Sequence, residues 1–304
     1  PADARGGGGR DGVNVRSVEV GPRDGLQNEK QPIPTEVKVA LVDALSEAGY
    51  EEIEVSAFVS PKWIPQLADA SEVFARIRRR PGVVYSALVP NEQGLDRALE
   101  ARVGKVAVFT AASETFNRKN INATIEESIA RFAPVVPRAL EAGVRVRGYI
   151  STAFSCPYEG KIDSSAVVAV AKRLLDLGVE ELSIGDTIGK ATVEEVNVLL
   201  DRLLDAVPQD RIALHFHDTY GMAVANALAA YERGITIFDA SVGGVGGCPY
   251  APGAAGNVAT EDLALAFQRS GAPVSLDLAK VSAACDLLAS ALGRRLRPPA
   301  SPSA

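Results

Sequence analysis

Short apolar segments alternate with amphipathic helical patterns along most of the chain. Apolar and β-branched residues predict eight strands, at 15–20, 52–56, 83–88, 105–110, 144–151, 180–185, 211–217 and 236–242. Apolar positions at helical spacing predict helices near 35–48, 68–80, 91–102, 124–142, 163–177, 192–206, 221–233 and 260–270. The pattern therefore indicates eight strand–helix units in succession.

The predicted helices carry start and stop signals. Thr124 with Glu127, and Thr192 with Glu195, match the capping box that satisfies free N–H groups at a helix start. Glycines stand just past four of the helical patterns, where a left-handed residue is favoured: Gly49, Gly143, Gly178 and Gly234.

Eight such units, with strands apolar enough to be buried on both faces, predict an α/β fold, a (β/α)₈ TIM barrel. A doubly wound open sheet is the alternative, and the lack of a G-x-G-x-x-G string after the first strand weighs against it. We expect the catalytic barrel to span 13–271 and an additional C-terminal helix to span 272–293. The segments 1–12 and 294–304 have the composition of disordered chain.

Composition narrows the class of protein. The 304 residues are 47% hydrophobic, which fits a globular protein with a large core, and no apolar run approaches the ~20 residues of a membrane span. A net charge of −6 argues against a nucleic-acid or membrane partner. Three cysteines without metal or dithiol spacing favour a reducing compartment, and with no recognisable signal peptide we expect the cytoplasm.

The only two histidines, His215 and His217, lie two positions apart at the end of a predicted strand. Side chains at i and i+2 of a strand point to the same face, so both imidazoles are directed at one small volume. Imidazole is the commonest metal ligand and the side chain that titrates nearest neutral pH. The spacing therefore predicts a metal site or a proton-transfer site, against the alternative of two hydrogen-bonded core histidines.

Polar side chains also follow other predicted strands. Barrel enzymes place their active sites where the strands end, so these residues are expected to meet at one mouth. They are Arg23, Asp24, Glu54, Asp186, His215, His217, Cys248 and Asn257. Glu54 could instead be a structural ion-pair partner of Arg23, and Asp186 could cap a loop. Cys248 lies in a glycine-rich segment rather than an apolar element, which favours a catalytic role, whereas Cys156 and Cys285 are expected to be inert.

A ligand set can be argued from these residues. His215 and His217 supply two nitrogens, Asp24 a carboxylate oxygen and Asn257 an amide oxygen. Mixed nitrogen and oxygen ligation without thiolate suits Mg²⁺ or Mn²⁺ better than Co²⁺ or Zn²⁺. Two histidines and one carboxylate also describe non-haem iron oxygenases, so ligand chemistry alone leaves the reaction open.

Several strings resemble the 3-hydroxy-3-methylglutaryl-CoA lyase family, within the larger group of metal-dependent barrel lyases and Claisen condensing enzymes. They are VGPRDGLQNEK at 20–30, FVSPKW at 58–63, KNIN at 119–122, CPYEGK at 156–161, GDTIG at 185–189, HDTYG at 217–221 and GGCPYA at 246–251. The resemblance runs from about residue 15 to about residue 270. The strings around 58–63 and 246–251 are the most specific to the lyase.

The resemblance implies a divalent-metal-dependent retro-Claisen cleavage of 3-hydroxy-3-methylglutaryl-CoA to acetyl-CoA and acetoacetate, as in leucine breakdown and ketone-body formation. It implies that Arg23 stabilises the developing enolate and that Cys248 is the catalytic thiol. Glu54, Asp186 and Glu261 would support the site. Either His215 or Asp24 could take the hydroxyl proton. Ala57 stands where relatives often have serine, which keeps open a longer-chain substrate such as the isohexenyl analogue.

Two further alternatives are a Claisen synthase and a non-enzymatic barrel. Synthases usually add a long C-terminal domain, and a scaffold needs neither the Cys248 segment nor a charged mouth. Candidate residues for the CoA phosphates are Lys30, Lys62, Lys119, Arg147 and Lys161. The extra C-terminal helix makes a homodimer the expected assembly.

Overall fold

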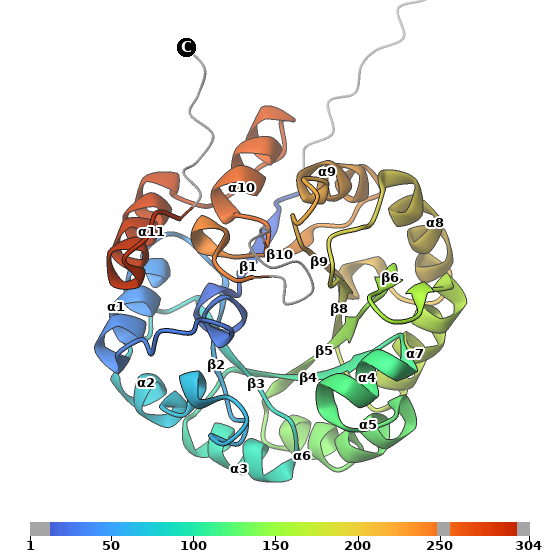
Figure 1. Cartoon of the computed structure of the whole chain (residues 1–304), viewed down its shortest axis with the longest axis horizontal. Helices are drawn as coiled ribbons and strands as arrows, with labels where there is room; N and C mark the ends of the chain where they lie inside the picture. The colour runs from blue at the N-terminus through green and yellow to red at the C-terminus, as the bar shows by residue number, and fades with distance from the viewer. Residues whose placement is uncertain (1–12, 248–255, 297–304) are drawn as a thin grey trace, which may run out of the picture.

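All eight predicted strands are present and close into one parallel barrel. The computed structural model describes residues 13–247 and 256–296. The strands are β1 (Arg16–Glu19), β2 (Glu52–Ala57), β3 (Val84–Leu88), β4 (Lys105–Ala111), β5 (Arg145–Ser151), β8 (Glu181–Asp186), β9 (Ile212–Phe216) and β10 (Ile237–Ala240). Around the barrel the order is β1-β10-β9-β8-β5-β4-β3-β2 (Figure 1). The TIM-barrel prediction is therefore confirmed.

Helices cover the outside of the barrel (Figure 1). They are α1 (Thr35–Ser46), α2 (Ala70–Arg76), α3 (Glu92–Glu100), α4 (Glu114–Ile121), α5 (Ile125–Phe132), α6 (Val135–Glu141), α7 (Ser164–Asp176), α8 (Val193–Leu204), α9 (Ala223–Glu232), α10 (Thr260–Arg269) and α11 (Leu278–Leu292). Both predicted capping boxes are formed, at Thr124 and at Thr192. The glycines predicted to follow helices all have positive φ.

Three local predictions were wrong or incomplete. The single helix expected over 124–142 is two helices, α5 and α6, because Pro134 between them has no N–H to continue the hydrogen-bond ladder. The helix expected to reach residue 80 ends at Arg76, and Ile77 is extended. Helix α4, capped by the Ser113 hydroxyl, and the small hairpin of β6 (Ser155–Cys156) and β7 (Gly160–Lys161) were not predicted.

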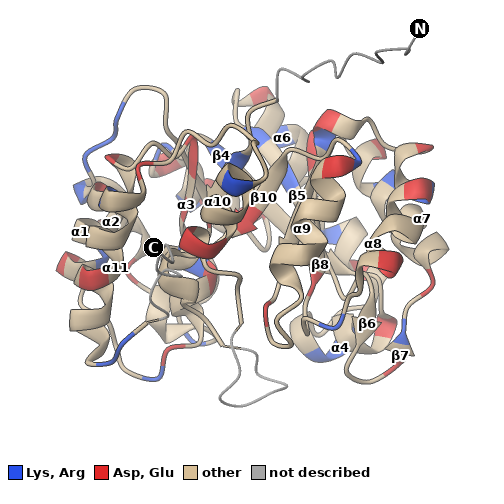
Figure 2. Cartoon of the chain, turned by 90° about the horizontal axis from the view of Figure 1, so that it is seen from above, with Lys and Arg blue, Asp and Glu red and all other residues tan. Residues whose placement is uncertain are grey.

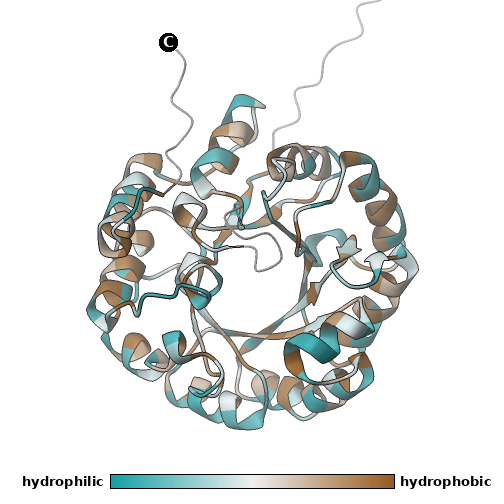
Figure 3. Ribbon diagram, viewed as in Figure 1, coloured by the Kyte–Doolittle hydropathy of each residue, from teal (hydrophilic) through white to brown (hydrophobic). Residues whose placement is uncertain are grey.

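The main apolar core lies between the barrel strands and the helices. In Figure 3 the helix faces that turn toward the barrel are mostly hydrophobic, and the outer faces are mostly hydrophilic. Acidic and basic residues are interspersed over those outer faces (Figure 2). Such a surface is typical of a protein whose apolar surface is largely buried. Among the described residues, no helix is long and apolar enough to cross a membrane.

Charged side chains occupy the inside of the barrel. Lys105 on β4 bonds Glu52 on β2 at 2.8 Å and Glu181 on β8 at 2.9 Å. Arg147 on β5 contacts Glu181 at 3.2 Å and Asp239 on β10 at 2.5 Å. Only the Arg147–Glu181 contact joins neighbouring strands, and the other three contacts cross the barrel interior. The interior is thus a network of paired charges, which is the condition for burying them.

The C-terminal helix α11 packs against α1 and also against the short segment that follows β10. Val281, Ala284, Cys285, Leu288 and Leu292 form its buried face. The additional helix predicted after the barrel is present. Residues 1–12 and 297–304, on which disorder was predicted, lie outside the described residues.

Candidate active site

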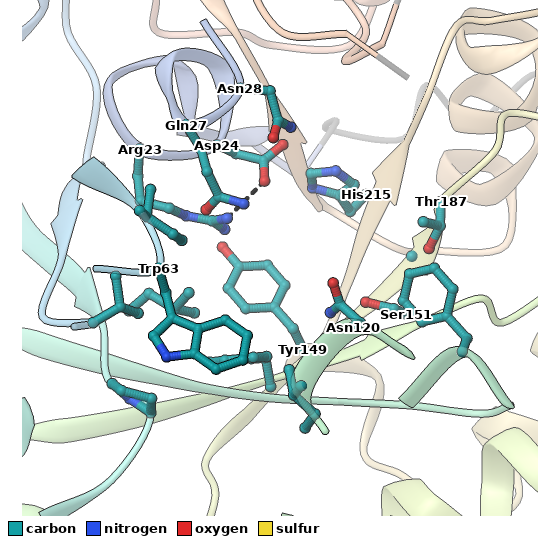
Figure 4. Close-up of a pocket in the computed structure, with 18 of the residues that line it drawn as sticks. Arg23, Asp24, Gln27, Asn28, Trp63, Asn120, Tyr149, Ser151, Thr187 and His215 are labelled. Carbon is teal, nitrogen blue, oxygen red and sulfur yellow. Dashed lines mark hydrogen bonds and ion pairs between the residues drawn. The ribbon is translucent and has the colours of Figure 1, made fainter. Parts of the chain in front are cut away.

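One cavity of about 630 Å³ opens where the strands end, at the face where the polar residues were expected to meet. Its polar side includes Arg23, Asp24, His215 and His217, with Ser183 and Thr187 beside them. Its apolar side is formed by Val59, Ile64, Leu88, Phe109 and Phe116. Figure 4 shows Asp24 and His215 directed toward the same space, with Tyr149 below Arg23. The cavity therefore has chemically different halves.

A tight π-helical turn, η1 (Gly21–Gly25), follows β1 and presents Arg23 and Asp24 to the cavity. The N–H groups of Asp24 and Gly25 both donate to the Val20 carbonyl, which closes the turn. A Cβ at residue 25 would lie 2.5 Å from Val245 Cγ1 and 2.9 Å from the Val245 carbonyl oxygen. Glycine is required there because the backbone of the segment after β10 packs directly on the turn.

Arg23 is held in place by two carboxylates. Its Nε donates to Glu54 Oε2 at 2.7 Å, and its Nη1 donates to Asp24 Oδ1 at 2.6 Å. The Tyr149 hydroxyl also donates to Glu54 Oε2, at 3.1 Å, and the Tyr149 ring lies under the guanidinium. Glu54 is fully buried, so it acts as the ion-pair partner that positions Arg23 at the cavity wall.

The imidazoles of His215 and His217 face the same volume, as their spacing predicted, with ring centroids 5.3 Å apart. Ligand atoms of Asp24, His215 and His217 all lie within 4.8 Å of one another. Asn257 pairs with His217 through an isolated bridge, and its Nδ2 donates to Asp24 Oδ2 at 2.9 Å. The four predicted ligands are therefore brought together from the ends of β1, β9 and the chain that re-enters after β10.

Two residues of this cluster, His217 and Asp24, hold the protonation states that a divalent cation requires. Burial and the neighbouring His215 lower the pKa of His217 to about 4, so its imidazole is neutral at neutral pH. Against the effect of burial, Arg23 and the two imidazoles bring the pKa of Asp24 down to about 2. Neutral imidazole and ionised carboxylate are the metal-binding forms. His217 Nδ1 is buried and has no hydrogen-bond partner in the described chain, which also fits a ligand role.

Two further carboxylates predicted to support the site, those of Asp186 and Glu261, accept hydrogen bonds from the backbone of loops around the cluster. Asp186 accepts hydrogen bonds from the backbone N–H groups of Lys190 and Ala191, so its carboxylate holds the loop after β8 and does not line the cavity. Both carboxylate oxygens of Glu261 accept from Gly243 N, at 3.0 and 2.9 Å. Burial raises the pKa of Asp186 and of Glu261 to about 6 each.

Glu19 fixes the two segments that flank the cluster. Its Oε1 accepts from Gly21 N at 2.8 Å and from Val242 N at 2.9 Å, which ties the turn after β1 to the segment after β10. Its Oε2 accepts from the Thr260 hydroxyl at 3.1 Å. Complete burial raises the pKa of Glu19 to about 7. Sequence reading did not single out this residue, although a carboxylate in an apolar strand was a usable signal.

The basic residues predicted to contact the CoA phosphates do not line the cavity that Asp24, His215 and His217 line. Lys30, Lys62 and Lys119 are exposed, and none of them lines the cavity. Lys161 is also exposed and pairs with Glu195 at 3.1 Å. Arg147 cannot contact a CoA phosphate, because it is 1% exposed and paired inside the barrel. That candidate was wrong.

Cys248 lies outside the described residues. The nearest described residues before and after Cys248 are Gly247 and Gly256. They lie close together, because a Cβ at Gly256 would be 2.9 Å from the carbonyl carbon of Gly247. Gly247 lines the cavity.

Sequence reading also missed Tyr149, Ser183 and Asp239, three buried polar residues inside apolar strands. Asp239 Oδ2 contacts His215 Nδ1 at 3.2 Å. The signal was the same one that identified Glu54, a polar residue among apolar strand neighbours.

Comparison with known proteins gives one consistent family. The family model described as HMGL-like matches residues 14–288. A relative from Pseudomonas aeruginosa, named 3-hydroxy-3-isohexenylglutaryl-CoA/hydroxy-methylglutaryl-CoA lyase, is 56% identical over 82% of this chain and 83% of its own. A Danio rerio relative named 3-hydroxy-3-methylglutaryl-CoA lyase, cytoplasmic, is 51% identical over 93% of this chain and 84% of its own.

Other matches agree. A Rattus norvegicus relative named hydroxymethylglutaryl-CoA lyase, mitochondrial, is 50% identical over 92% of this chain and 86% of its own. The crystal structure of hydroxymethylglutaryl-CoA lyase from Pseudomonas aeruginosa superposes with a TM-score of 0.92 at 50% identity, covering 94% of this chain and 95% of that one.

The raised pKa of Glu19 predicts a pH-dependent stability. Between pH 4.5 and about 7 the folded protein holds a proton on Glu19 that the unfolded chain releases. The free energy of unfolding therefore falls with rising pH across this range, by about 3 kcal/mol from this group. Glu19→Gln is expected to remove that part of the slope in urea unfolding measured at a series of pH values. Parallel pH profiles for the two proteins would contradict this role.

Proposed function

The chain belongs to the 3-hydroxy-3-methylglutaryl-CoA lyase family and is a carbon–carbon lyase, and we propose that it cleaves 3-hydroxy-3-methylglutaryl-CoA to acetyl-CoA and acetoacetate. The C2–C3 bond breaks, the 3-hydroxyl loses its proton and becomes the ketone of acetoacetate, and the acetyl-CoA enolate gains a proton at carbon. One proton is lost and one is gained, so the reaction balances without an oxidant or reductant.

One observation carries this proposal: the ligand atoms of Asp24, His215 and His217 cluster within 4.8 Å, beside the buried guanidinium of Arg23. A retro-Claisen cleavage needs a hydroxyl made acidic and an oxygen whose negative charge is stabilised. The cluster and the guanidinium line the same cavity, so one substrate could meet both.

Asp24, His215, His217 and Asn257 would hold one divalent cation, and the mixed nitrogen and oxygen set supports Mg²⁺ or Mn²⁺. When bound, such a cation would supply Lewis acidity that lowers the pKa of the substrate hydroxyl.

Either Asp24 or His215 would accept the hydroxyl proton. His215 Nδ1 faces Asp239 at 3.2 Å, and its other ring nitrogen is assigned to the ligand set. Arg23 would donate hydrogen bonds to the thioester oxygen as negative charge develops on it, in the manner of an oxyanion hole. Its pairing with Glu54 fixes the guanidinium before substrate arrives, so little reorganisation is needed.

We assign to Cys248 the delivery of the proton to the enolate carbon. The assignment rests on the sequence, in which this cysteine stands in the string GGCPYA shared with the lyase family. Its chain neighbour Gly247 lines the cavity, which supports a role at the reacting carbon. General acid catalysis of this kind typically contributes 10²–10⁴-fold to the rate.

Partner and compartment follow from the same proposal. The ligand is an acyl-CoA, and Lys30, Lys62 and Lys119 stay candidates for its phosphates. Cys156 and Cys285 are both unpaired, which supports a reducing compartment such as the cytoplasm. Relatives carry both cytoplasmic and mitochondrial names, and both fit unpaired cysteines. We retain a homodimer as the proposed assembly.

A second candidate function is cleavage of a longer-chain 3-hydroxyglutaryl-CoA, such as the isohexenyl analogue. Two observations favour it: the apolar half of the cavity, and the printed name of the Pseudomonas aeruginosa relative. Val59 and Leu88, which line the cavity, belong to one apolar cluster with the small residues Ala57 and Ala107. An extended apolar substituent at C3 could therefore be buried against this wall.

Metal dependence is the first test. Release of acetoacetate from 3-hydroxy-3-methylglutaryl-CoA should require added Mg²⁺ or Mn²⁺, stop on chelation and return when the cation is restored. Circular dichroism before and after chelation controls for unfolding. Turnover that survives exhaustive chelation would refute the proposed metal site.

Two substitutions test the chemical roles. Arg23→Gln should lower kcat by about 10²–10³-fold, because it removes donors to the developing oxyanion. Cys248→Ala should lower kcat by about 10²–10⁴-fold. Arg138→Gln, at a surface ion pair, and Cys156→Ala, at a buried thiol, are matched controls expected to keep near wild-type rates. Near wild-type turnover in either test variant would contradict the chemical role proposed for that residue.

The length of the substrate's C3 substituent is tested by assaying both substrates with the unmodified enzyme and with one variant. Leu88→Phe adds bulk to the apolar wall, so it should lower kcat/KM for the isohexenyl substrate at least about 10-fold more than for 3-hydroxy-3-methylglutaryl-CoA. If the unmodified enzyme does not turn over the isohexenyl substrate, the second function is wrong.

A further inference from the structure

Asp239 is a buried carboxylate inside the barrel that contacts one of the two imidazoles. It is 2% exposed and lies on β10, in register with His215 on the neighbouring strand β9. Its Oδ2 lies 3.2 Å from His215 Nδ1 and accepts a hydrogen bond from the Ser183 hydroxyl at 2.7 Å. Its Oδ1 accepts from Arg147 Nη2 at 2.5 Å. Four different strands thus contribute to one hydrogen-bonded group.

The orientation of this carboxylate is fixed from two sides. Arg147 takes one oxygen and Ser183 the other, and Arg147 is itself held by Glu181 at 3.2 Å. A buried carboxylate paired with a guanidinium is ionised and can only accept hydrogen bonds. Its contact with His215 Nδ1 is therefore a hydrogen bond only when that nitrogen carries the proton.

We propose that Asp239 is a positioning residue that holds neutral His215 in the tautomer protonated at Nδ1, with Nε2 left free for the metal. Arg147 and Ser183 act through it by fixing the carboxylate. This inference rests on the proposed function where it treats His215 as a metal ligand. Partners of this kind set the ring orientation and the basicity of a ligating histidine.

The other imidazole provides an internal comparison. His217 Nδ1 is buried without a hydrogen-bond partner among the described residues, so no carboxylate selects its tautomer. Asp239 should therefore control His215 and leave His217 unchanged. Because these are the only two histidines of the chain, each can be followed separately.

The first measurement reads the tautomer without any metal. Protein labelled with ¹⁵N-histidine gives two imidazole signal sets in a long-range ¹H–¹⁵N correlation spectrum, and His217→Gln assigns them. At alkaline pH, where imidazole is neutral, we expect His215 to be protonated at Nδ1. Asp239→Asn replaces the acceptor by an amide that can donate to Nδ1, so it should move the His215 proton to Nε2.

The second measurement is the affinity for Mn²⁺ alone, followed by the electron paramagnetic resonance signal of the free ion. Asp239→Asn should weaken binding about 10–100-fold. Glu52→Gln is the matched control: it removes one carboxylate charge from the same buried network, but among the described residues Glu52 forms ion pairs with Lys105 and Arg16 and not with Arg147 or an imidazole. Its Mn²⁺ affinity should stay within about two-fold of wild type, even if both variants lose stability.

The outcomes separate the two proposals. An Nε2-protonated His215 in the unmodified protein overturns the role of Asp239, and this result needs no variant to fold. An unchanged tautomer and affinity in Asp239→Asn overturn it as well, and so does an equal loss of affinity in Glu52→Gln. Absence of Mn²⁺ binding by the unmodified protein instead refutes the proposed metal site, while the tautomer still decides the role of Asp239.

Discussion

The pairing of buried charges across the barrel interior is the constraint on which the site depends. Arg147 joins Asp239 and Glu181, and Lys105 joins Glu181 and Glu52. All of these contacts except Arg147–Glu181 span strands that are not neighbours. Removing one partner from such a pair leaves an uncompensated charge, which typically costs 3–5 kcal/mol. The strands are thus fixed relative to one another by a network that extends to the catalytic cluster through the contact of Asp239 with His215.

Hydrogen-bonded charges form one half of the cavity, and apolar side chains form the other. At η1, the carboxylates of Glu54 and Asp24 hold the Arg23 guanidinium, and Asn257 bonds Asp24, so this part of the polar half is preorganised. On the side of β2 to β4, Leu88, Phe109 and Val59 present apolar surface. Charge chemistry and the accommodation of an acyl substituent are therefore separated within one space, and the reaction can stay constant while the substituent varies.

The fold and half of the site could be predicted because their signals are local. Parallel strands buried on both faces appear as apolar runs, and His215 and His217 share a face because the strand repeat is two residues. Asp239 and Arg147 were missed as partners because they are 92 residues apart in sequence, and only the barrel order brings them together. The break at Pro134 was visible in the sequence, but the apolar stripe on both sides of it suggested one helix.

The central claim is that Asp24, His215 and His217 form a divalent-cation site at the end of the barrel. Anomalous diffraction at the manganese absorption edge, from crystals of the full chain grown with Mn²⁺, tests it most directly. The account predicts one strong peak per chain, within bonding distance of a carboxylate oxygen of Asp24 and one nitrogen of each imidazole. Well-ordered side chains of all three residues with no peak between them, or a peak only elsewhere, would contradict it.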